Sequence, residues 1–201
     1  GDKKLIDWTI NSALKSSEVD KIVVTSPDND VLSHVKKIYK NQVLLHYRDA
    51  ELASINLDIY STISTILAEI NDDFVPDFII VLNIEAPFRS SMYIDKSVHV
   101  MQIFNVDMVI GVKCDDDMFF VHDGGGLKPF HKDEHTRLER DSLYKKVGGI
   151  TLINREYFEK RNNVIEGLSG LIGHINLDQK AAFLIKSKLD LKIAKALAEI
   201  K

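Results

Sequence analysis

Cysteine is almost absent from this chain, which has a single thiol, Cys114, among its 201 residues. One cysteine cannot form an internal disulfide, and the sequence contains no Asn-x-Ser/Thr acceptor for N-glycosylation. The composition gives no indication of a secretory compartment, so we expect a cytoplasmic protein.

An excess of positive charge is absent as well. The chain carries 26 lysines and arginines against 30 aspartates and glutamates, which gives a formal net charge of −4. Partners such as nucleic acid or anionic membranes require basic surface that neutralises phosphate groups, so this balance argues against both. Apolar runs such as 78–82 are far shorter than the roughly 20 residues that cross a bilayer. The first residues also do not show the basic segment followed by an apolar segment that is typical of a signal peptide.

What the chain does contain is the composition of one globular domain, 1–201, with 45% hydrophobic and 28% charged residues. Apolar residues recur at helical spacing in some segments and gather in short β-branched runs in others. We predict helices near 6–14, 31–39, 59–70, 94–104 and 189–200, and strands near 21–25, 42–47, 77–84, 106–114, 145–154 and 171–177. This alternation predicts an α/β layered fold, in which the run at 77–84, apolar on both faces, is a central parallel strand.

The order of these elements is unusual at its start. Sheets of this class normally begin with a strand that lies mid-sheet and has the ligand at its carboxyl end. Here the first residues begin a helix. We expect that the first strand lies upstream of this chain; the alternative is an unusual sheet. A missing central strand would leave two strand edges unpaired.

The segment 115–143 differs from the rest because it is acidic, glycine-rich and contains scattered histidines. We interpret it as an excursion from the core within the single domain. Its three glycines, 124–126, are followed by Leu127-Lys128-Pro129 and not by a helix, which favours a hairpin or a mobile loop over a phosphate-binding loop.

Three side chains after predicted strands are candidates for substrate binding. Arg48 and Arg89 follow the strands at 42–47 and 77–84, where α/β sheets bind ligands, and a guanidinium can grip a carboxylate or phosphate with two hydrogen bonds. The alternative for both is a surface arginine beside the next helix. Asn83 ends the apolar strand and could hydrogen-bond a sugar hydroxyl, or it could be a strand-end amide with satisfied partners.

Two aspartates have both a functional and a structural interpretation. Asp28 could orient a nucleotide, but Pro27-Asp28-Asn29-Asp30 before a helical stripe is first a turn and an N-cap. Asp190, near the start of the last helix, could be a metal ligand, although the helix dipole favours acidic residues there in any case.

Four segments, in order and at natural spacing, resemble one enzyme family. They are "DKKLIDWTINSALKSSEVDKIVVTSPDNDVLSHVKKI", "YRDAELASINLDIYSTISTIL", "DFIIVLNIEAPFRSSMYID" and "LDLKIAKAL". The sequence resembles the acylneuraminate cytidylyltransferase (CMP-sialic acid synthetase) family and the related CMP-ketodeoxyoctonate synthetases.

This resemblance implies a three-layer, Rossmann-like nucleotidyltransferase fold with a mostly parallel sheet. It implies transfer of CMP from CTP to a nonulosonic or octulosonic acid, with release of pyrophosphate and with Mg²⁺ as the cofactor. It further implies a homodimer, in which the excursion reaches the partner's sugar site and Arg140 contacts the sugar carboxylate. Five apolar side chains of the excursion could anchor that interface: Met118, Phe119, Phe120, Leu127 and Phe130. The alternative is a hairpin that folds back on the protein's own core.

The sequence departs from the family's pattern at several functional positions. The triphosphate loop of the family would precede Gly1, and Asn83 stands where the family has glutamine. Leu184 and Lys186 align with the family's Asp-x-Asp metal pair, so no catalytic residue is assigned. The alternative hypothesis is therefore a catalytically degenerate relative that binds a nucleotide or sugar, or acts as a dimer partner. A more distant alternative is a nucleotide-sugar binder that uses the acidic run 115–117.

Overall fold

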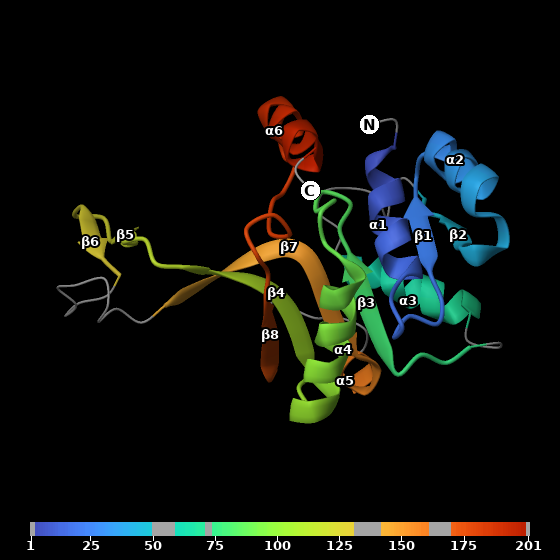
Figure 1. The fold of residues 1–201 in the computed structure, drawn as a ribbon. Helices are drawn as coiled ribbons and strands as arrows, with labels where there is room; N and C mark the ends of the chain where they lie inside the picture. The colour runs from blue at the N-terminus through green and yellow to red at the C-terminus, as the bar shows by residue number, and fades with distance from the viewer. Residues whose placement is uncertain (1–2, 50–58, 71–73, 131–141, 161–169, 200–201) are drawn as a thin grey trace.

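The computed structural model describes residues 3–49, 59–70, 74–130, 142–160 and 170–199. Helices and strands alternate through most of this chain (Figure 1). In chain order the elements are α1 (Leu5–Leu14), β1 (Val23–Ser26), α2 (Asn29–Tyr39), the 3₁₀ turn η1 (Lys40–Gln42), β2 (Leu44–Tyr47), α3 (Ile59–Ile70), β3 (Phe78–Leu82), α4 (Ser91–Phe104), β4 (Met108–Asp115), β5 (Phe120–His122), β6 (Leu127–Pro129), β7 (Leu143–Asn154), α5 (Arg155–Lys160), β8 (Ile172–Asn176) and α6 (Lys188–Glu199).

A four-stranded sheet in the order β3-β7-β4-β8 forms the centre of the molecule. On one face α1 and α4 pack against it, in a core that includes Ala13, Ile94 and Met101. On the other face α3 and α5 contribute Ile63 and Phe158 to a second cluster. Helices on both faces of a sheet make three layers, so the predicted α/β layered fold is confirmed.

The sheet pairings are mixed in direction. Strands β4 and β8 are parallel, as are β1 and β2, whereas β7 runs antiparallel to both of its neighbours, β3 and β4. The chain leaves β4 at Asp115, passes through the excursion and returns as β7 beside the strand it left. A strand that returns directly next to its predecessor pairs antiparallel with it, which explains the direction of β7.

Strands β1 and β2 form a separate two-stranded sheet, in register from Val23 opposite Leu44 to Ser26 opposite Tyr47. Among the described residues β1 pairs only with β2 and β3 only with β7, so each of these two strands keeps one unpaired edge. All five residues of β3 are half-buried, and not buried as expected for a central strand. Because one edge of β3 is unpaired, its residues are less buried than those of a central strand. The strand expected upstream stays a prediction.

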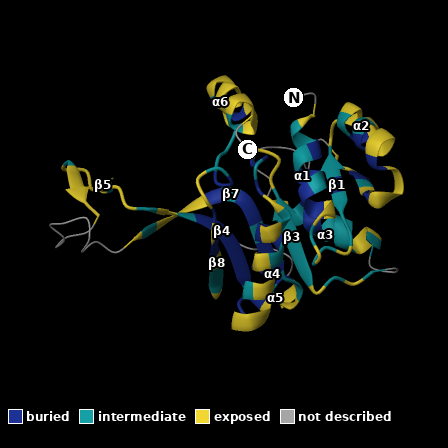
Figure 2. Ribbon diagram, viewed as in Figure 1, coloured by how far each residue is buried: buried dark blue, intermediate teal, exposed yellow. Residues whose placement is uncertain are grey.

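The excursion is an arm that leaves the body of the molecule, with the hairpin β5–β6 at its far end (Figures 1 and 2). The turn between these strands contains Gly124 at φ 92° and Gly126 at φ 141°, a backbone region in which residues with a Cβ are strained. The predicted hairpin at 124–126 is therefore confirmed. Residues 131–141, which include Arg140, lie outside the described part of the chain.

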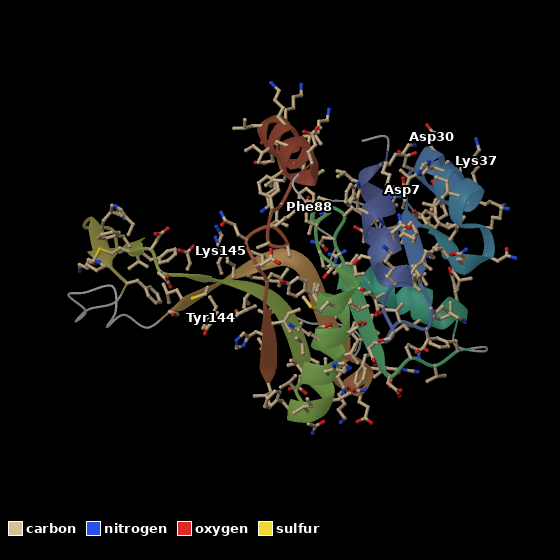
Figure 3. The ribbon with its side chains drawn as sticks, viewed as in Figure 1. Asp7, Asp30, Lys37, Phe88, Tyr144 and Lys145 are labelled. Carbon is tan, nitrogen blue, oxygen red and sulfur yellow. The ribbon has the colours of Figure 1, made fainter. Side chains whose placement is uncertain are left out.

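A buried carboxylate fixes α1 against α2. Asp7 accepts hydrogen bonds from the Lys4 backbone N–H at 3.0 Å and from the Tyr39 hydroxyl at 3.1 Å, and it lies 3.0 Å from His34 Nε2. Figure 3 labels Asp7 on α1 beside α2. Burial and the hydrogen bond to Asp7 raise the pKa of Tyr39 from 10.0 to about 12. This contact sets the position of α1, whose outer residues line a cavity described below.

None of the helices in the described ranges is both long and apolar enough to cross a membrane.

Candidate functional site

A cavity of about 540 Å³ lies between β1, β3 and α3, along the unpaired edges of β1 and β3 where the strand expected upstream would lie. Most of its wall is apolar, but Thr25, Arg48 and Asn83 line it at the carboxyl ends of β1, β2 and β3. Open α/β sheets bind ligands at this edge because helix N-termini and loop side chains converge there. The structure therefore brings together two of the residues that the sequence marked as candidates, Arg48 and Asn83.

Arg48 is held at this edge through its backbone. Its N–H donates to the Ser26 carbonyl at 3.1 Å, which continues the pairing of β2 with β1 by one residue. The side chain is half-buried, and its Nε has no hydrogen-bond partner in the described part of the chain. A guanidinium with an unused donor inside a cavity is suited to a carboxylate or phosphate ligand.

Asn83 lies one residue beyond β3 and is exposed. A Cβ added at Gly148 would stand 3.4 Å from Asn83 Nδ2 and 3.6 Å from Leu184 Cδ1. The amide and the leucine therefore both lie against Gly148 of β7, where the glycine leaves room for them. The amide is exposed, and the residue of the segment 184–186 that shares the space beside Gly148 with it is apolar.

Arg89 does not share this cavity. Only 2% of the residue is exposed, and Nη1 donates to the carbonyls of Asn83 at 3.4 Å and of Gly149. These bonds tie the backbone at Asn83, just beyond β3, to Gly149 of β7. Burial lowers the pKa of Arg89 from 12.5 to about 10. Nε and Nη2 have no hydrogen-bond partner among the described residues.

The two candidate aspartates both lie near the start of a helix. Asp28 is the exposed N-cap of α2 and accepts from the Asp30 N–H at 2.8 Å, so the capping interpretation is confirmed. Asp190 accepts from the Lys186 N–H at 3.0 Å, and its own N–H donates to Ser187 Oγ at 3.1 Å. Hydrogen bonding involving Ser187 and then the Lys186 backbone lowers the pKa of Asp190. Its carboxylate therefore organises the first turn of α6.

The described ranges contain no group of three or more His, Cys, Asp or Glu side chains that could hold a metal ion. Leu184 lies beside Asn83, Lys186 is exposed, and Asp190 is occupied in the first turn of α6. The described residues consequently do not fit the Mg²⁺ that the resemblance implies, because a hard cation requires several oxygen ligands.

Sequence analysis missed two polar side chains that lie beside the site. Thr25 Oγ1 is 2.9 Å from Nδ1 of His46, which is buried and paired in register with it across β1 and β2. His46 Nε2 lies 3.6 Å from Glu69 Oε1 on α3. A histidine inside the otherwise apolar run at 42–47 is the sequence signal that could have identified this pair.

Three solved structures share the fold of this chain across nearly their whole length. The 4-diphosphocytidyl-2C-methyl-D-erythritol synthase of Anaerococcus prevotii is 13% identical, with a TM-score of 0.71 over 99% of this chain and 87% of that one. A CMP:2-keto-3-deoxy-manno-octonic acid synthetase complexed with CTP is 12% identical, with a TM-score of 0.68 over 98% and 88%. The 2-C-methyl-D-erythritol 4-phosphate cytidylyltransferase of Thermus thermophilus is 14% identical, with a TM-score of 0.63 over 100% and 91%.

No family model matches the sequence, and no curated protein matches it at a significant level. At identities of 12–14% the three structures establish the fold of this chain, an α/β fold with helices on both sides of the sheet.

Proposed function

We propose that this chain is a cytidylyltransferase that transfers CMP from CTP to a 2-keto sugar acid of the nonulosonic or octulosonic type. The observation that carries the proposal is the convergence of Thr25, Arg48 and Asn83 in one cavity at the carboxyl ends of three strands. Support comes from the similar structures, which are named for enzymes that transfer a cytidylyl group, one of them complexed with CTP.

The chemistry of the proposed reaction suits these side chains. The anomeric hydroxyl oxygen of the acid attacks the α-phosphorus of CTP and loses its proton, while the bond from the α-phosphorus to the bridging oxygen breaks and releases pyrophosphate. Arg48 would neutralise the carboxylate of the acid or a phosphate, and Asn83 would hydrogen-bond a sugar hydroxyl. Arg89 contributes indirectly, by holding the strand end from which Asn83 projects.

The test is pyrophosphate release by the purified chain with CTP, Mg²⁺ and a panel of acids. The panel contains sialic, pseudaminic, legionaminic and ketodeoxyoctonic acids, with 2-C-methyl-D-erythritol 4-phosphate as the non-acid comparison. We expect release with one acid, and a loss of about tenfold or more in kcat/KM for both Arg48→Ala and Asn83→Ala. The exposed Asn41→Ala and Lys37→Ala variants serve as matched controls and should retain activity. Absence of release with every acid would reject the catalytic proposal.

A second candidate function is binding of the nucleotide or sugar without catalysis. The observation that favours it is Leu184, which lies beside Asn83 where the resemblance places a metal-ligating carboxylate. Isothermal titration calorimetry with CTP and with each acid separates the two functions. Saturable binding without pyrophosphate release supports the binding protein, and release supports the enzyme.

We propose further that the arm mediates a homodimer. Phe120, Leu127 and Phe130 are 49%, 69% and 54% exposed on a hairpin that projects from the body, and exposed apolar side chains on such an extension favour a protein partner. Sedimentation velocity should show a dimer, which Phe120→Ser with Leu127→Ser dissociates. Ile103→Ser, at a 73% exposed position on α4, is the control that should leave it intact. A dimer that survives the double change contradicts this role of the arm.

A further inference from the structure

A second cavity, of about 520 Å³, lies between α1, the loop from β3 to α4 and the segment around Lys180. Among the described residues, it shares no lining residue with the cavity between β1 and β3. Figure 3 labels Phe88, a wall residue of this second cavity, between α1 and α6. Its volume falls within the range of roughly 300–1,000 Å³ that is typical of small-molecule sites.

The lining of this cavity is strongly basic. Four residues with cationic side chains line it, Lys3, Lys15, Arg89 and Lys180, and no aspartate or glutamate among the described residues does. This contrasts with the chain as a whole, whose net charge is −4. Lys180 also interacts with Asp178, whereas Lys3 and Lys15 form no ion pair within the described ranges. Cations gathered in a concave site raise the local concentration of anions.

Arg89 adds an observation that is independent of the surface lysines. It is 98% buried, no carboxylate neutralises it among the described residues, and its Nε and Nη2 lack hydrogen-bond partners. A buried charge without a counter-ion is costly, and an anion in the adjoining cavity would offset that cost. The partial positive charge at the start of α4 faces the same place, because Ser90 and Ser91 line the cavity and the Ser90 side chain makes no capping bond.

We propose that this cavity binds a small polyphosphate anion, such as a diphosphate or triphosphate group, at a site separate from the proposed substrate cavity. The several cationic groups around the cavity favour a ligand with several negative charges over a single carboxylate. Trp8 and Phe88, in edge-to-face contact at 5.9 Å between ring centroids, form the apolar part of the wall. Lys180 Nζ lies 5.6 Å from the Phe88 ring, so the aromatic wall and the basic lining are contiguous.

The chain supplies its own reporter for this site, because Trp8 is its single tryptophan. The experiment titrates the full chain with inorganic pyrophosphate and triphosphate in the absence of CTP and follows Trp8 emission. We expect a saturable change, with orthophosphate binding more weakly and added neutral salt weakening all three. Lys15→Gln should raise the apparent Kd for pyrophosphate about fivefold or more, since a hydrogen bond to a charged group is lost.

Two control variants locate the binding. Lys37→Gln removes the same charge from the exposed face of α2, outside the cavity (Figure 3), and should leave the Kd unchanged. Arg48→Gln tests the proposed substrate cavity instead: a Kd for pyrophosphate that rises in Arg48→Gln and not in Lys15→Gln would place the anion there and overturn the proposal. No saturable response to either polyphosphate would overturn the proposal, as would a response that Lys15→Gln and Lys180→Gln both leave unaltered. Pyrophosphate is also a product of the proposed transfer, so the comparison of Lys15→Gln with Arg48→Gln distinguishes this site from the substrate cavity, whether or not the chain releases pyrophosphate from CTP.

Arg89 itself is tested through stability. Pyrophosphate should raise the Tm of the wild-type chain, and by less in Lys15→Gln, because a ligand that binds only the folded state stabilises it. Arg89→Lys keeps the positive charge but loses the several N–H donors of the guanidinium group. The rise in Tm with pyrophosphate should be smaller still in this variant. A rise that is equal in all three proteins would place the anion elsewhere.

Discussion

The contact between Asp7 and Tyr39 makes the stability of this chain depend on pH in a way that can be calculated. Tyr39 is 5% exposed, and its hydroxyl donates to Asp7 Oδ1 at 3.1 Å. Burial disfavours the tyrosinate form, and the neighbouring carboxylate both accepts a hydrogen bond from the hydroxyl and repels a second negative charge, so the pKa of Tyr39 rises to about 12.

The direction and size of the effect follow from this shift. Between pH 10.0 and about 12 the unfolded chain loses the Tyr39 proton while the folded chain keeps it, so the free energy of unfolding falls as the pH rises. Two pKa units correspond to a total loss of about 2.7 kcal/mol, of which about 1.3 kcal/mol is reached by about pH 11.

The measurement is urea unfolding of the wild type and of Tyr39→Phe at about pH 9 and about pH 11. The phenylalanine variant cannot titrate at this position, so the stability advantage of the wild type over the variant should shrink by about 1.3 kcal/mol between the two conditions. Asp7→Asn, which keeps the size of the side chain and removes its charge, should show a smaller shift. A difference between wild type and Tyr39→Phe that is the same at both pH values would refute this reasoning.

Other predictions concern stability away from this contact. Phe158→Ala should lower the free energy of unfolding by about 3–5 kcal/mol, because the side chain is fully buried between α5 and the sheet. Phe104→Ala, at a 66% exposed position, should cost less than about 0.5 kcal/mol in the same urea titration. Gly170→Ala should cost about 2 kcal/mol or more by thermal unfolding, because φ is 84° and the new Cβ would lie 2.8 Å from the Tyr157 hydroxyl.

The sequence was sufficient to predict most of the helices and strands, because periodicity depends on local apolar spacing, but it missed the short helix α5 (Arg155–Lys160). The strand expected at 42–47 is β2 (Leu44–Tyr47), and the helix expected at 31–39 lies within α2 (Asn29–Tyr39). The periodicity of apolar residues does not indicate whether two strands pair parallel or antiparallel. The antiparallel direction of β7 could therefore not be deduced from the run at 145–154. For the same reason the separation of β1–β2 from the main sheet appears only in the pairing pattern.

The candidate site shows that the sequence also does not determine the direction in which a side chain points. Position after a strand was enough to place Arg48 and Asn83 at one edge of the sheet, although their roles in binding stay predictions. Arg89 satisfies the same rule but points into the protein, where it bonds the carbonyls of Asn83 and Gly149. Spacing in the sequence cannot distinguish an arginine that faces a ligand from one that holds two strands together.

The segment 184–186 offers the sharpest distinction between an enzyme and a binding protein of the same fold. Leu184 is half-buried beside Asn83, and Lys186 is exposed. Leu184→Asp with Lys186→Asp would add two carboxylates where the resemblance places metal ligands. If the chain is already active, pyrophosphate release should stay the same or fall in this double variant.

If instead the chain has lost its metal site, the double variant should gain Mg²⁺-dependent release that EDTA abolishes. The matched control is Leu189→Asp with Lys192→Asp, which makes the same chemical changes at exposed positions of α6. Activity gained in both variants would reflect charge alone and would contradict a role for the segment 184–186. Because replacing the half-buried leucine should cost about 1–3 kcal/mol, both variants are to be assayed where urea titration shows them folded. A gain confined to the 184/186 variant would mean that the fold retains a nucleotide site in which only the metal ligands are missing.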